Sequence, residues 1–128
     1  MTKTVIRTEA APAPFQGAPY NQAIAASGLV FVAGQLGLGP GESEMLGDSI
    51  EEQTEQVMKN LGAILEEAGS GLDRLVKTTV YLTELTDFAG MNDVYARYVG
   101  DQPPARATVG VSQLPSGAKV EIEAVAVV

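Results

Sequence analysis

Hydrophobic and polar positions alternate in short runs along most of the chain, which is the pattern of half-buried strands. The runs are rich in valine, isoleucine, alanine and threonine, and they predict six strands over residues 4–7, 21–26, 29–33, 75–85, 107–114 and 119–128. Ser27-Gly28 is a turn dipeptide, so the second and third strands are predicted to pair as a hairpin. The short connection over residues 115–118 predicts a second antiparallel hairpin between the last two strands.

In two segments the apolar residues recur every three or four positions, which is the spacing of a helix. Between residues 50 and 68 one apolar stripe is formed by Ile50, Thr54, Val57, Leu61, Ile64, Leu65 and Ala68. Asp48 or Ser49 can cap its start, and Gly69 can end it. A shorter helix is predicted over residues 87–98, before Pro103 and Pro104. The order of elements predicts one α+β domain over residues 1–128, a six-stranded mixed sheet with both helices packed on one face.

The face of the sheet away from the helices is predicted to carry small, weakly polar side chains. On the fifth strand, Arg106 and Thr108 share one side, and on the last strand Glu121 and Glu123 share one side. A surface of this kind suits burial against a second copy of the chain, so a homo-oligomer is expected; the alternative is a solvated face. Arg106 and Glu121 are expected on neighbouring strands, where they would share a site.

Composition removes several classes of function. Sixteen acidic and eight scattered basic residues give a net charge of −8, which argues against nucleic acid and anionic membranes as partners. Histidine and cysteine are absent, which excludes Ser-His-Asp and thiol catalysis and nearly all zinc sites, and no metal site is predicted. The N-terminus lacks the apolar run of a secretory signal, so a cytoplasmic location is the default expectation.

Several motifs, in order along nearly the whole chain, resemble the reactive-intermediate deaminases, the RidA or YjgF family, also described as endoribonuclease L-PSP. Residues 104–114 read Pro-Ala-Arg-Ala-Thr-Val-Gly-Val-Ser-Gln-Leu and are followed by Val-Glu-Ile at 120–122. Upstream, residues 19–23 are similar to the family's early Pro-Tyr-Ser-Gln-Ala segment, and residues 32–35 are similar to its Ser-Gly-Gln turn. Residues 76–82 are similar to its central strand, and residues 87–92 are similar to the start of its second helix.

This resemblance implies a chorismate-mutase-like subunit and a homotrimer with three clefts between subunits. It also implies hydrolysis of short 2-imino acids, such as 2-iminopropanoate and 2-iminobutanoate, to 2-oxo acids and ammonia. The family enzymes need no cofactor, which agrees with the absence of histidine and cysteine here.

The resemblance also assigns the candidate site. It implies that Arg106 holds the substrate carboxylate. Sequence alone favours a structural salt bridge for this residue. The planar guanidinium of arginine can bind a carboxylate through two parallel hydrogen bonds, which lysine does poorly. Glu121 would position or activate the hydrolytic water, or else be an ordinary ion-pair partner. Tyr20 would wall the cleft, or pack in the core. The remaining expected substrate-binding residues are Thr108, Ala33 and Gly34.

Three departures from the family pattern bear on substrate preference. Ala33 stands where serine is common, Thr108 stands where cysteine is common, and the segment before Tyr20 is one residue longer. Three other functions remain open: a non-catalytic trimer that binds or senses 2-oxo or amino acids through Arg106, a ribonuclease, and a holdase that shields unfolded clients.

Overall fold

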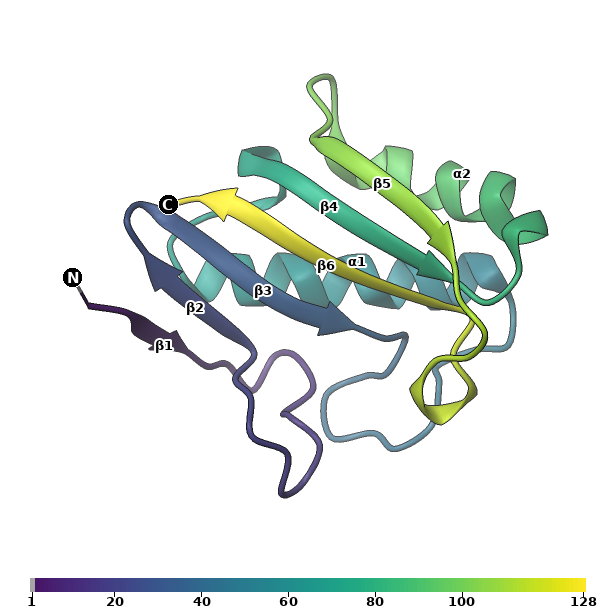
Figure 1. The fold of residues 1–128 in the computed structure, drawn as a ribbon, viewed down its shortest axis with the longest axis horizontal. Coiled ribbons are helices and arrows are strands. Elements are labelled where there is room, and N and C mark those ends of the chain that lie inside the picture. The colour runs from purple at the N-terminus through teal and green to yellow at the C-terminus, as the bar shows by residue number, and fades with distance from the viewer. Residues whose placement is uncertain (1) are drawn as a thin grey trace.

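The computed structural model describes residues 2–128, which form one sheet covered on one side by two helices (Figure 1). The sheet is mixed and has the strand order β1-β2-β3-β6-β4-β5. The strands are β1 (Thr4–Ile6), β2 (Ala23–Ala26), β3 (Leu29–Gln35), β4 (Leu75–Leu82), β5 (Ala105–Gly110) and β6 (Val120–Val127). The helices are α1 (Ile50–Glu67) and α2 (Phe88–Val99). The predicted fold class is confirmed.

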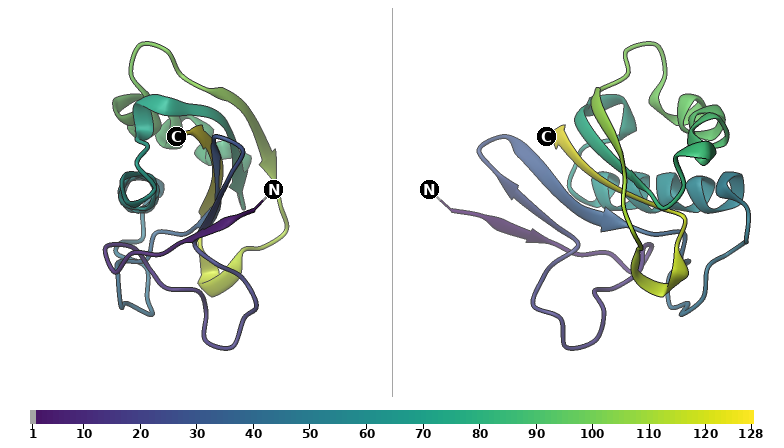
Figure 2. Two further views of the ribbon diagram at one scale, coloured as in Figure 1. Left: turned by 90° about the vertical axis from the view of Figure 1, so that its left-hand side faces the viewer. Right: turned by 45° about the vertical axis from the view of Figure 1, so that its right-hand side comes forward.

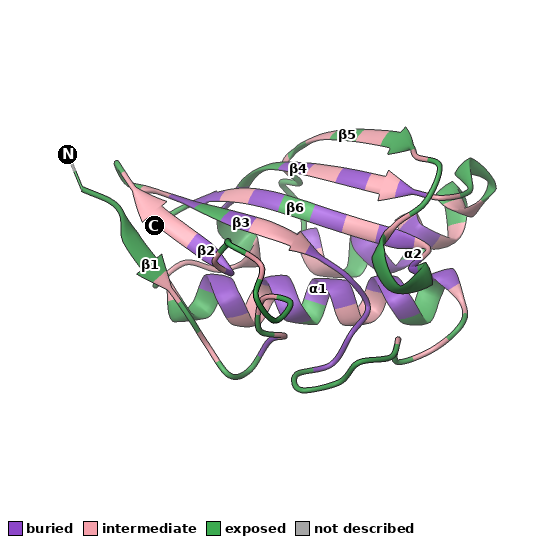
Figure 3. Cartoon of the chain, turned by 60° about the horizontal axis from the view of Figure 1, so that its bottom comes forward, coloured by how far each residue is buried: buried purple, intermediate pink, exposed green. Residues whose placement is uncertain are grey.

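Both helices lie on the same side of the sheet (Figure 2), and the core fills the space between the two layers. The α1 stripe supplies Val57, Met58, Leu61, Ile64 and Leu65, none of which has exposed surface. The strands show the complementary alternation of buried and accessible residues (Figure 3). Burial of these apolar side chains is the main source of stability for the two layers. No helix within residues 2–128 has the length and apolar character needed to cross a membrane.

Helix α1 begins and ends where the sequence predicts. Ser49 is the N-cap: its hydroxyl accepts a hydrogen bond from the Glu52 amide at 3.0 Å, and the Glu52 carboxylate accepts one from the Ser49 amide at 3.2 Å. This reciprocal pair is a capping box. After the helix, Gly69 adopts a φ of +80°, the left-handed conformation that glycine allows at a helix C-terminus.

The buried face of α1 also holds the long loop between β3 and α1. Asn60 is 1% exposed, and its side-chain amide donates to the carbonyls of Leu36 at 3.1 Å and Leu38 at 2.8 Å. Gln53 donates to the carbonyl of Gly47 and accepts from the Lys119 amide. These two side chains satisfy backbone groups that would otherwise be buried without partners.

The predicted hairpin between β2 and β3 is confirmed. Ala26 pairs with Leu29, which leaves Ser27 and Gly28 as a two-residue turn. Both residues have positive φ, 55° and 79°, as a type I′ turn requires.

The predicted hairpin between the last two strands is wrong. Strand β5 pairs in parallel with β4, and β6 pairs antiparallel with both β3 and β4, so β5 and β6 are not neighbours. The connection between β4 and β5 runs through α2, and a crossover helix is what a parallel pair needs. The turn at Pro115–Gly117 therefore carries the chain past β4 rather than back along β5.

Candidate active site

Arg106 lies on edge strand β5, on the side of the sheet that faces the helices. It pairs in register with Thr78 of β4, a fully buried residue of the helix-facing side. Thr108 pairs with buried Val80 and therefore lies on the same side. Both residues are half-buried, because β5 is at the edge of the sheet. The expectation that Arg106 lies on the uncovered face is wrong.

Two aromatic rings of α2 contact the Arg106 side chain. The guanidinium carbon lies 4.9 Å from the ring centre of Tyr95 and 5.5 Å from that of Phe88. The Tyr95 hydroxyl is in turn 2.6 Å from the hydroxyl of Thr78, and both residues are buried. Within residues 2–128 no carboxylate forms an ion pair with this guanidinium. Its donors are thus available to an anion from outside.

Glu121 lies on the opposite face. It pairs with Tyr81 on β4, and its carboxylate lies directly against Gly34 of β3. A β-carbon at Gly34 would overlap the Glu121 Oε2 atom and lie 2.8 Å from Cδ, so only glycine leaves room for this carboxylate. Burial, and then the charge of Glu123, raise the pKa of Glu121. A carboxyl group with a raised pKa is better matched to proton transfer near neutral pH.

A bulge in β3 shapes the backbone beside this carboxylate. Val32 pairs with Ala124 and Gln35 with Ile122, so β3 contains one extra residue at Ala33 and Gly34. Bulges of this kind redirect side chains and free backbone groups, and they are frequent next to active sites. The two predicted residues Ala33 and Gly34 therefore lie at an irregularity of the sheet rather than in a turn.

Tyr20 lies in the loop before β2, close to the same end of β3. Its hydroxyl accepts a hydrogen bond from the Phe15 amide at 3.0 Å, and its side chain is 42% exposed, so the alternative of core packing is wrong. Tyr20 and Gly34 line one small cavity, and Tyr20 and Ala33 line a larger groove of about 450 Å³ on the open face.

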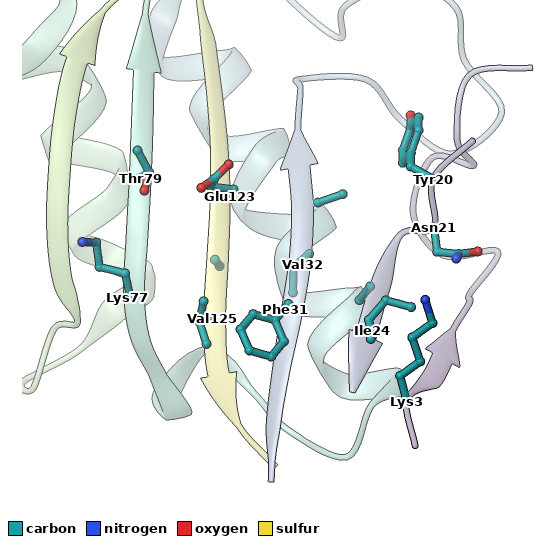
Figure 4. A pocket seen from close by; sticks show the side chains of 13 residues that line it. Lys3, Tyr20, Asn21, Ile24, Phe31, Val32, Lys77, Thr79, Glu123 and Val125 are labelled. Carbon is teal, nitrogen blue, oxygen red and sulfur yellow. The ribbon is translucent and has the colours of Figure 1, made fainter. Parts of the chain in front are cut away.

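The groove runs over four strands of the open face. Figure 4 shows Phe31 beside Val125, and Glu123 near Thr79 on the neighbouring strand. Phe31 is 45% exposed, and large apolar side chains at the same face include Val5, Val109 and Val127. The open face is therefore more apolar than the alternation of Thr, Ser and Glu predicts.

The structure thus divides the six predicted residues into two groups. Tyr20, Ala33, Gly34 and Glu121 gather near one end of β3 on the open face, and we call them the carboxylate half-site. Arg106 and Thr108 form the arginine half-site on the helix side of β5. Strand β4 lies between β6, which carries Glu121, and β5, which carries Arg106, so these two strands are about 10 Å apart across the sheet. The expectation that Arg106 and Glu121 lie on neighbouring strands is wrong.

Sequence reasoning missed the residues that support Arg106. Phe88 and Tyr95 are seven residues apart, so they lie on one face of α2, and Thr78 is a polar residue on an otherwise apolar side of β4. A buried polar residue in such a strand signals a specific hydrogen-bond partner. No group of three or more acidic, histidine or cysteine side chains within residues 2–128 is arranged to hold a metal ion.

The fold and the two groups of residues define an α+β domain with an arginine at one sheet edge and a carboxylate on its open face. The sequence profile described as endoribonuclease L-PSP matches residues 8–128. The chain is 50% identical to a RutC family protein of Pyrococcus abyssi, over 98% of each chain. It is 48% identical to the Arabidopsis thaliana protein named Reactive Intermediate Deaminase A, chloroplastic, over 97% of this chain and 65% of that protein.

A solved structure with the same fold is that of Escherichia coli TdcF with bound serine. The two chains are 34% identical over 98% of each, with a TM-score of 0.89. The chain belongs to the Rid family, which is also described as endoribonuclease L-PSP.

Proposed function

We propose that the chain is a cytoplasmic, cofactor-independent deaminase that hydrolyses short 2-imino acids, such as 2-iminopropanoate and 2-iminobutanoate, to 2-oxo acids and ammonia. The observation that carries the proposal is the Arg106 guanidinium, which stacks on two rings and has no carboxylate partner among residues 2–128. A guanidinium held this way presents paired donors to a substrate carboxylate. A relative named Reactive Intermediate Deaminase A and a TdcF structure with bound serine support the same ligand class.

The two half-sites act together only if they come from different subunits. Within one chain Arg106 and Glu121 lie on opposite faces of the sheet, so one small substrate cannot contact both. The exposed apolar side chains of the open face favour burial against another copy. The enzyme is therefore proposed to be a homotrimer, with each cleft formed by the arginine half-site of one subunit and the carboxylate half-site of the next.

In this cleft Arg106 binds the carboxylate of the protonated imine. Glu121 accepts a proton as a water molecule adds its oxygen to the imine carbon, which gives a tetrahedral carbinolamine. Glu121 then returns the proton to nitrogen. As the carbon–nitrogen bond breaks and ammonia leaves, Glu121 takes the proton of the carbinolamine hydroxyl, which becomes the 2-oxo group, and that proton passes to ammonia to give ammonium. The raised pKa of Glu121 suits these transfers. The Gly34 backbone, which lies against this carboxylate, leaves it room to reach the water.

The activity test generates 2-iminobutanoate with a threonine dehydratase and measures 2-oxobutanoate release against a semicarbazide trap. The protein should accelerate release, and Arg106→Ala should abolish the acceleration. Arg97→Ala is the matched control, because Arg97 is an exposed arginine of α2 outside both half-sites. No acceleration by a folded protein would refute the short-chain imine assignment.

A mixing experiment tests the division between subunits. Arg106→Ala and Glu121→Gln are each expected to be inactive, and the two are unfolded and refolded together. If each cleft takes one half-site from each of two subunits, about a quarter of the clefts in random mixed trimers contain both intact residues. Activity should return to that level. If mixing restores nothing although mixed trimers form, the two residues do not act across an interface.

The other functions give different outcomes in these assays. A sensing protein would bind 2-oxobutanoate through Arg106 without accelerating its release. A ribonuclease would show salt-sensitive RNA binding, which the net charge of −8 disfavours. A holdase would suppress client aggregation equally well with Arg106→Ala.

A further inference from the structure

We infer that Tyr95 is a positioning residue for Arg106: its ring supports the guanidinium, and its hydroxyl, held by Thr78, fixes the ring. The inference rests on the proposed function only in that Arg106 must bind a carboxylate for the effect on activity to appear. The contact geometry itself is independent of any ligand.

The ring contact is the first step of the argument. The Arg106 guanidinium carbon is 4.9 Å from the Tyr95 ring centre, within the range in which a cation is attracted to the face of an aromatic ring. Arg106 is on an edge strand and only half-buried, so the backbone alone leaves its long side chain several rotamers. A ring beneath the guanidinium restricts these rotamers before any ligand arrives, and preorganisation of this kind improves binding.

The second step is the hydrogen bond that fixes the ring. Tyr95 is 5% exposed and Thr78 is fully buried, and their hydroxyl oxygens are 2.6 Å apart. Thr78 pairs in register with Arg106, so the anchor of the ring and the arginine lie side by side on adjacent strands. A ring used for packing alone could be phenylalanine, which needs no polar partner at this depth. The hydrogen bond between Tyr95 and Thr78 instead connects α2 to β4 beside the Arg106 side chain.

The third step separates Tyr95 from Phe88. Phe88 is 44% exposed and its ring centre is 5.5 Å from the guanidinium carbon, so it covers the outer side of Arg106. Tyr95 is the buried ring against the guanidinium and is held by a hydrogen bond, whereas the Phe88 ring is exposed to solvent. Loss of the Tyr95 hydroxyl should therefore alter Arg106 without removing any atom that a substrate can reach.

The first measurement needs no substrate. Nitrogen-15 relaxation of the Arg106 Nε–H group reports the order of the side chain. Tyr95→Phe and Thr78→Val should both lower this order, whereas Thr78→Ser, which keeps a hydroxyl, should restore it. Tyr98→Phe is the matched control: it removes another partly buried phenol of α2, one whose hydroxyl is near Glu55 rather than Arg106. If Arg106 is equally ordered in all variants, the inference is wrong.

The second measurement uses imine hydrolysis. Tyr95→Phe and Thr78→Val should each raise KM by about threefold to tenfold with little change in kcat, and the double variant should be no worse than either. Thr78→Val tests the same anchor should Tyr95→Phe fail to fold. Unchanged KM in an enzyme that Arg106→Ala inactivates would overturn the positioning role alone. Inactive wild-type protein with an ordered Arg106 would overturn the proposed function and leave the positioning role supported by relaxation.

Discussion

Replacing Gly34 with alanine tests the close contact between β3 and Glu121. The new β-carbon would overlap Glu121 Oε2 and lie 2.8 Å from Cδ and 3.0 Å from Cγ, so the glutamate side chain must rotate away. Crowding of this kind costs about 1–3 kcal/mol in a packed site, toward the lower end here because Glu121 is half-buried and can move. Alanine also recovers about 0.5–1 kcal/mol relative to glycine in a strand. The net loss of stability should therefore be small, about 0–0.5 kcal/mol.

The activity should fall much further than the stability. Displacing Glu121, the proposed general base, by about 1 Å is expected to lower kcat on the order of a hundredfold. Urea unfolding at fixed protein concentration measures the first effect, and the imine assay measures the second.

A double-mutant cycle makes the reasoning refutable. Glu121→Ala removes all three atoms that the new β-carbon meets, so in that background Gly34→Ala should cost nothing or stabilise slightly. An equal loss of stability in both backgrounds would show that the glycine is needed for its backbone and not for the carboxylate.

Four further outcomes are expected. The pKa of Glu121 is raised above 4.5, so its protonated form favours the native state and this contribution is lost as pH rises through the raised value; Glu121→Gln should therefore gain stability relative to the parent as pH rises above 4.5 in urea titrations. Ser49→Ala removes the N-cap of α1 and should cost about 1 kcal/mol in thermal unfolding. Asn60→Ala leaves two buried loop carbonyls without their donor and should cost about 2–4 kcal/mol in urea. Burial raises the pKa of Tyr98 to about 12, so Tyr98→Phe should remove a late step from the ultraviolet titration.

Local structure was predictable where a few neighbouring residues determine it. The turn at Ser27-Gly28 and the cap at Ser49 depend on residues within four positions of each other, and both predictions are confirmed. The α1 stripe is similarly local, because its period alone identifies the buried face.

Strand order was not predictable from the same signals. The turn at Pro115–Gly117 shows that the chain changes direction, but it does not specify which strand β6 will join. The stronger signal was the strand–helix–strand order of β4, α2 and β5, which is typical of a parallel pair. That order indicates that β5 lies beside β4, which separates Arg106 from Glu121 on β6.

The contacts among the candidate site residues could not be predicted from the sequence. Tyr20, Gly34 and Glu121 are brought together as neighbours, although nothing in their spacing along the chain indicates it. Arg106 depends on Tyr95, and that contact between β5 and α2 arises from tertiary packing that alternation within one strand cannot reveal.

The central position of β6 has a consequence for synthesis of the chain. This strand is made after the other five, yet it is the one that joins β3 to β4. Until it leaves the ribosome, β1–β3 and β4–β5 are two separate sheet fragments, each with an open edge and an uncovered apolar side. The sheet is therefore completed only after β6 has been made, and until then the unpaired edges of β3 and β4 are open to pairing with other chains.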